Sequence, residues 1–92
     1  MIADSGLPAR DVIAAGFRDL ESRIESVEAL LVSIGAPRLA RLGMVAANPL
    51  PDAEHRLYLR LAAADRSSAH SRYNALIRLL VSFERAAECA RQ

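Results

Sequence analysis

Apolar residues recur with a regular heptad spacing near the end of the chain. Steps of four and three residues alternate through the positions Ala69, Tyr73, Leu76, Leu80, Phe83, Ala87 and Ala90. This spacing places all of these side chains on one face of an α-helix, as in a coiled coil. A helix with such a face is stable in water only when the face packs against another helix.

The same spacing occurs near the start of the chain. It runs through Ile13, Phe17, Leu20, Ile24, Val27, Leu31 and Ile34. We therefore expect a helix over about residues 9–34, with Pro8 in a first turn where its missing N–H costs nothing. Gly35 and Pro37 follow, and both residues are typical of helix ends, so we expect a break and a short second helix over residues 37–47.

The run Asn48-Pro49-Leu50-Pro51 predicts a loop, because it contains two prolines and an asparagine before the first. Asp52 is a suitable N-cap residue, and no glycine or proline follows it. The sequence therefore predicts one long helix over residues 52–91.

The two heptad faces match in register. When residue i is placed opposite residue 100 − i, the apolar positions of the first helix meet those of the last. We therefore predict an all-α fold, an antiparallel helical hairpin with a kinked first arm. A flexible tail over residues 1–7 precedes a single helical domain over residues 8–92. A compact bundle of three separate helices is the alternative.

The apolar surface is wider than a two-helix seam can bury. The additional apolar positions include Leu30, Ile77, Leu79 and Val81. We expect these four residues to bind a partner. The partner is either a second copy, which would complete a four-helix bundle, or another helical protein.

Length and composition limit the class of protein. The 92 residues allow one small domain, and 52% of them are hydrophobic. The single cysteine, Cys89, allows no internal disulfide and fits a reducing compartment. The start of the chain lacks the features of a signal peptide, and no apolar run has membrane-spanning length. We expect a cytoplasmic protein without membrane partners.

All twelve basic side chains are arginines, and the net charge is +1. A bacterial-like, GC-rich genome explains this usage, although arginine also suits phosphate recognition. In the predicted hairpin, basic residues gather at the loop end. Arg38, Arg41, Arg56 and Arg60 are therefore candidate contacts for an anion or nucleic acid, and a nucleic-acid-binding helical dimer is an alternative function.

The sequence shows no arrangement typical of an active site or a metal site. His55 and His70 are fifteen residues apart, about 22 Å along a helix, and cannot share a metal ion within one helix. Cys89 has no base nearby in the sequence. We expect no catalytic residue, metal or cofactor.

One family resemblance offers another alternative. The segment RIESVEALLVSIGAPRLARLG and residues 52–92 resemble the all-helical chorismate mutase family in size and helical rhythm. The resemblance places Arg38, Arg56 and Gln92 at family-like positions and implies a helical-bundle enzyme. However, the family's first-helix arginine falls on Glu21, and its lysine has no counterpart. We therefore favour a small non-enzymatic interaction module of adaptor, chaperone-like or regulatory type.

Overall fold

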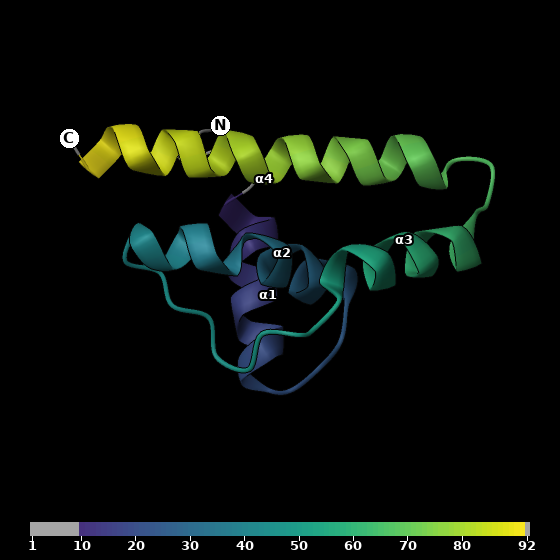
Figure 1. Cartoon of the computed structure of the whole chain (residues 1–92), viewed down its shortest axis with the longest axis horizontal. Coiled ribbons are helices and arrows are strands. Elements are labelled where there is room, and N and C mark those ends of the chain that lie inside the picture. The colour runs from purple at the N-terminus through teal and green to yellow at the C-terminus, as the bar shows by residue number, and fades with distance from the viewer. Residues whose placement is uncertain (1–9, 92) are drawn as a thin grey trace.

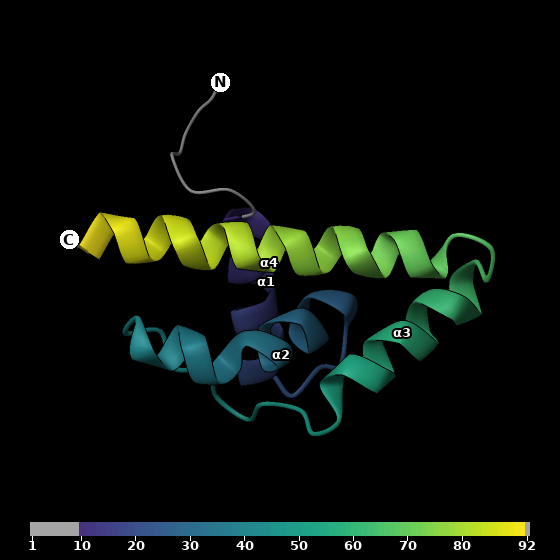
Figure 2. The same ribbon diagram turned by 45° about the horizontal axis from the view of Figure 1, so that its top comes forward.

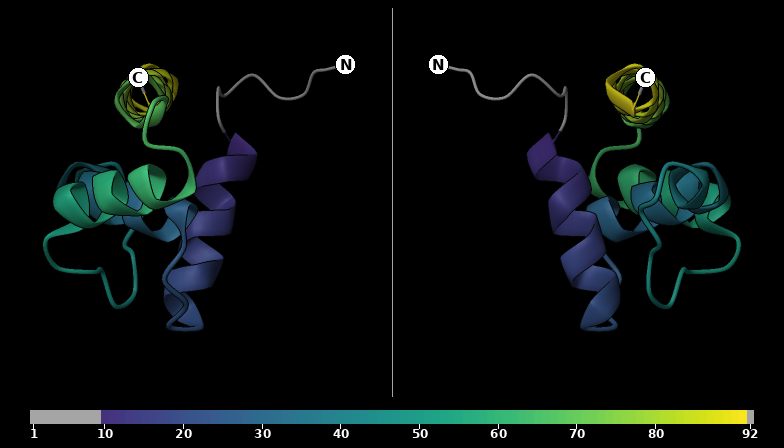
Figure 3. Two further views of the ribbon diagram at one scale, coloured as in Figure 1. Left: turned by 90° about the vertical axis from the view of Figure 1, so that its right-hand side faces the viewer. Right: turned by 90° about the vertical axis from the view of Figure 1, so that its left-hand side faces the viewer.

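The computed structural model describes residues 10–91, which form four α-helices and no strand. The helices are α1 (Arg10–Glu21), α2 (Val27–Arg41), α3 (Ala53–Ala64) and α4 (Ala69–Arg91). In Figure 1, α4 extends along the molecule, and α2 and α3 follow one another below it. Figures 2 and 3 show that α1 runs crosswise to α4 and lies beside α2. The prediction of an all-α fold is confirmed.

The prediction of one helix over residues 9–34 is wrong, because the chain turns at residues 22–26. Arg23 has a positive φ of 59°, which ends α1. The Ser26 hydroxyl then caps α2: it accepts a hydrogen bond from the Ala29 N–H at 3.0 Å and donates one to Asp19 at 2.6 Å. Ile24 consequently leaves the apolar seam and is 51% exposed.

The predicted break at residues 35–37 and the predicted helix over 37–47 are also wrong. Helix α2 continues through Gly35 and Pro37 to Arg41, and the chain turns instead at Gly43, whose φ is +91°. The Pro37 ring removes one hydrogen bond from α2. Burial of α2 outweighs that loss, because Leu31 before the proline and Leu39 after it are both fully buried.

The single helix predicted over residues 52–91 is divided into two at residues 65–68. The Asp65 carboxylate accepts hydrogen bonds from the N–H and the hydroxyl of Ser67, which stabilises a turn there. Asp52 precedes α3 as predicted, but its side chain makes no capping hydrogen bond. After the turn α4 packs back on α3, where the rings of Tyr58 and Tyr73 lie 5.8 Å apart.

Because of these turns, the hairpin is replaced by four shorter helices. Helix α1 packs mainly against α2, and α4 packs against both α2 and α3. The buried core draws apolar side chains from every helix: Ile13, Leu20, Ala29, Leu30, Leu31, Val32, Leu39, Ala53, Leu57, Leu61, Ala69, Leu80, Phe83 and Ala87. A single chain thus supplies four helices, whereas the sequence predicted a four-helix bundle formed by two copies of the chain.

The connection between α2 and α3 is tied to the core by two side chains. The buried Ser33 hydroxyl accepts a hydrogen bond from the Leu50 N–H at 2.9 Å, and the Asn48 amide donates to the Leu20 carbonyl at 3.2 Å. This connection therefore follows a defined path beneath α2.

The predicted tail over residues 1–7, the helix start at Pro8 and Gln92 lie outside the described residues. Within residues 10–91, none of the helices combines the length and apolar character that a membrane span requires.

Candidate functional site

A groove of about 450 Å³ lies between α2 and α4, and the start of α3 contributes to it. We call it the α2–α4 groove. Its apolar side chains are Ile34, Pro37, Ile77, Leu80 and Val81, and its polar side chains are Arg38, Arg41, Glu54, Tyr73, Asn74 and Glu84. Apolar surface between polar groups is typical of binding sites.

The sequence of α4 explains how the groove forms. Tyr73, Ile77, Val81 and Glu84 follow one another at steps of four, four and three residues, so they share one face of the helix. Gly35 of α2 faces this row closely: a Cβ atom there would lie 2.8 Å from both Glu84 Oε2 and Leu80 Cδ1. The absence of a side chain on Gly35 therefore allows α2 and α4 to approach each other at the groove.

Glu84 is the main polar feature of the groove. It is only 5% exposed, and its Oε1 atom lies 3.5 Å from Nη1 of Arg38. Burial raises the pKa of Glu84 above its ordinary value of 4.5, and the Arg38 guanidinium offsets part of that rise. A second hollow, of about 270 Å³, adjoins this ion pair and is lined also by Arg41, Leu42 and Glu88. Glu84 thus lies where the two hollows meet.

Two of the four predicted partner-binding residues line the groove. Ile77 and Val81 are half-buried and lie side by side along it. Leu79 is half-buried but lies outside the groove lining. Leu30 has no exposed surface, so the prediction that it contacts a partner is wrong in this fold. The turn at residues 22–26 reorients α2 and places Leu30 in the core.

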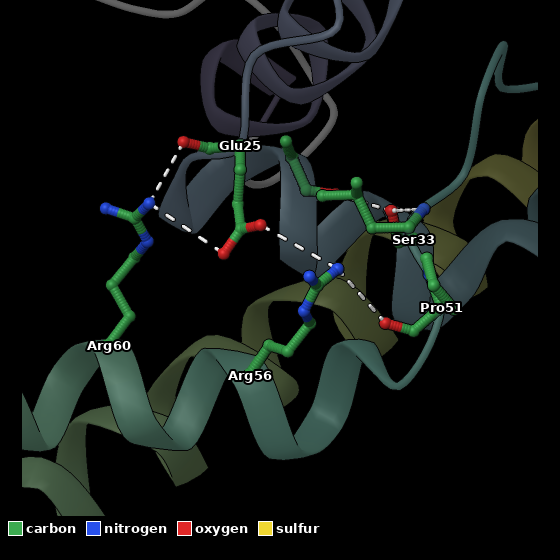
Figure 4. A network of polar contacts seen from close by, with 7 residues as sticks. Glu25, Ser33, Pro51, Arg56 and Arg60 are labelled. Carbon is green, nitrogen blue, oxygen red and sulfur yellow. Dashed lines mark hydrogen bonds and ion pairs between the residues drawn. The ribbon is translucent and has the colours of Figure 1, made fainter.

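The four predicted anion-binding arginines lie in two different surroundings. Arg38 and Arg41 line the groove, whereas Arg56 and Arg60 extend from α3 towards Glu25 in the α1–α2 turn (Figure 4). Their Nη1 and Nη2 atoms lie 3.7 and 3.9 Å from the Glu25 carboxylate, and Arg60 also donates to the Glu25 carbonyl. The hairpin that would gather all four arginines at one end is not formed.

Another hollow, of about 400 Å³, lies beside α1. Its walls are almost entirely apolar, and Arg10 is the charged residue among Ile13, Ala14, Phe17, Met44, Val45 and Phe83. Val45 is 77% exposed at this hollow. Nothing in its lining suggests a specific ligand.

The described residues bring together no group of three or more histidine, cysteine or acidic side chains suited to a metal ion. Cys89 is exposed, and His70 contacts Asn74 within α4. Of the positions given by the chorismate mutase resemblance, Arg38 pairs with Glu84 and Arg56 with Glu25, while Gln92 lies outside the described residues.

Sequence reasoning missed Glu84 as a site residue. A signal was present, because Glu84 continues the row of Ile77 and Val81 and is therefore an acid on an apolar face. Comparison with known protein families, curated proteins and solved structures finds no match for this chain.

Proposed function

We propose that this chain is a non-enzymatic interaction module that binds an amphipathic helix of another protein in the α2–α4 groove. The main support for this proposal is the half-buried apolar surface that Ile34 of α2 and Ile77 and Val81 of α4 form inside the groove. Binding of a helix would remove this apolar surface from water, and the polar residues around it would fix the orientation of the helix. An adaptor, chaperone-like or regulatory role in the cytoplasm is consistent with such a module.

The dimensions of the groove favour a helical occupant. The groove follows α4 from Tyr73 to Glu84, which is about 16 Å at 1.5 Å per residue. This length corresponds to three turns of a helix. An occupant with apolar residues at positions i, i+4 and i+7 would present them all to the groove floor.

The concave shape favours another protein over a second copy. A twofold dimer through this surface would place the groove against itself. Two hollows that face each other leave space unfilled, whereas a convex helix fills the groove. Nucleic-acid binding gains no comparable support, because Glu25 partly neutralises Arg56 and Arg60.

A selection experiment tests the proposal. A library of helical peptides displayed on phage, with one face randomised, is selected against the folded chain. The binders are then tested on Val81→Gln, which places a polar side chain in the groove, and on Ser82→Gln, which changes the adjacent exposed residue.

We expect Val81→Gln to weaken binding tenfold or more, and Ser82→Gln to leave it unchanged. Circular dichroism verifies that both variants are folded. A selection without binders, or binders that tolerate Val81→Gln, would overturn the proposed function.

A further inference from the structure

We infer that the α2–α4 groove selects a helix that carries a lysine or arginine side chain, and that this cation binds Glu84. The inference rests on the proposed function, because it concerns the occupant of the same groove. It assigns Glu84 as the residue that determines which helices bind.

The surroundings of Glu84 are the first observation that supports the inference. A buried carboxylate is costly unless hydrogen bonds and opposite charges compensate it. The 3.5 Å separation from Arg38 is longer than the roughly 2.7–2.9 Å of a strong charge-assisted hydrogen bond. Arg38 is itself 66% exposed, so solvent weakens its attraction to the carboxylate. Glu84 is therefore buried with incomplete compensation.

The shape of the site leaves room for a further donor. Glu84 lines both the α2–α4 groove and the adjoining 270 Å³ hollow. Gly35 and Leu80 occupy one side of the carboxylate, whereas the hollows lie open beside it. A long, flexible lysine or arginine side chain on a helix in the groove has the reach to enter this space.

The charges around the groove favour a cation over an anion. The two hollows together are lined by two arginines and three glutamates, which gives a formal charge of −1. A partner carboxylate near Glu84 would also lie close to Glu88, which lines the same smaller hollow. A partner cation would instead complete the pairing of Glu84.

Protonation gives the interaction a pH dependence. A bound cation favours the ionised carboxylate, so binding of the peptide releases a proton from any Glu84 that is still protonated. Because the pKa of Glu84 is raised, binding should weaken at a higher pH than for a glutamate with the ordinary pKa, as the pH falls through the pKa of Glu84. The charged and titratable groups that share the hollows with Glu84 are Arg38, Arg41, Glu54, Tyr73 and Glu88.

The selected groove-binding peptides provide the test. We expect them to be enriched in lysine or arginine at one helical position. Replacement of that residue by norleucine should weaken binding to the unmodified chain about tenfold. Glu84→Gln should cause a similar loss of affinity for the basic peptide and almost no loss of affinity for the norleucine peptide. A double-mutant cycle gives this result when the two side chains contact each other directly.

Glu21→Gln is the control, because Glu21 is an exposed glutamate at the end of α1 and lines neither hollow. It should leave the difference between the two peptides intact, and thermal unfolding verifies the fold of both variants. Peptides that depend on Val81 but bind equally well with and without the cation would overturn this inference alone. Failure of the peptides to depend on Val81 would instead overturn the proposed function.

Discussion

At the scale of single residues, the fold buries one charged side chain among the described residues, Glu84. The pKa of its carboxyl group is raised because burial disfavours the charged form more than Arg38 favours it. The unfolded chain ionises this group near its ordinary pKa of 4.5, whereas the folded chain does so at higher pH. Glu84 therefore lowers the free energy of unfolding as the pH rises through this window.

A stability measurement tests this linkage. Glu84→Gln should raise the free energy of unfolding at pH 7.5, because a neutral amide replaces a costly charge. The gain should shrink towards pH 4, where the carboxyl is mostly protonated in both states. Urea unfolding of both proteins at the two pH values measures the difference, with Glu88→Gln as an exposed control. A variant less stable than the parent at pH 7.5 would show that the Arg38 ion pair outweighs the burial cost.

Ser26 stabilises the turn between α1 and α2, which the heptad pattern does not indicate. Its hydroxyl caps α2 and also donates to Asp19 of α1. Ser26→Ala should therefore lower the free energy of unfolding by about 0.5–2 kcal/mol, the usual cost of a lost N-cap. Ser22→Ala, in the same turn but exposed, should change it by less than about 0.5 kcal/mol. Equal effects in chemical denaturation would argue against the cap.

At the scale of the helices, α1 and α2 cross closely at Gly16. A Cβ atom at this position would clash with the Glu28 carbonyl and with a methyl group of Val32. Because one of these neighbours is backbone, the helices must separate to accommodate any side chain. Gly16 thus has a packing role that a helical pattern alone does not indicate.

Gly16→Ala tests this crossing. We expect the free energy of unfolding to fall by about 1–3 kcal/mol, as overpacking usually costs, despite the higher helix propensity of alanine. Gly35→Ala is the comparison, because its Cβ would meet only the mobile ends of Leu80 and Glu84. It should cost less. Thermal unfolding gives both values, and a stabilised Gly16→Ala protein would contradict the crossing.

The helices also show how much of the fold can be predicted from the sequence. The heptad faces correctly indicated helices with buried faces, since spacing is a local property of the sequence. They did not indicate where helices end, because the turn at Asp65 and the cap at Ser26 depend on one or two side-chain hydrogen bonds. Pro37 has a local preference for a helix end, but α2 continues through it because the burial of α2 outweighs that preference.

The candidate site was predicted in separate parts. Ile77 and Val81 were assigned to partner binding, and Arg38 and Arg41 to an anion. Only the packing of α2 against α4 brings these residues together in one groove. Glu84 was missed, because the pattern does not show which flank of α4 faces a hollow.

At the scale of the whole molecule, one chain packs most of both heptad faces into a single core and leaves a groove on one side of α4. Binding of a helical segment from another protein in this groove is the central proposal. Photo-crosslinking tests it most directly. Benzoylphenylalanine is placed at Val81 in the groove or at the adjacent exposed Ser82, in cells that produce the protein. Mass spectrometry then identifies the attached peptides.

The predicted result is a crosslinked product from Val81 that does not form from Ser82. This product joins the chain to an amphipathic helix of another protein, and that helix has a lysine or arginine among its apolar residues. The same products from both positions, or a product joining Val81 to a second copy of this chain, would contradict the proposal.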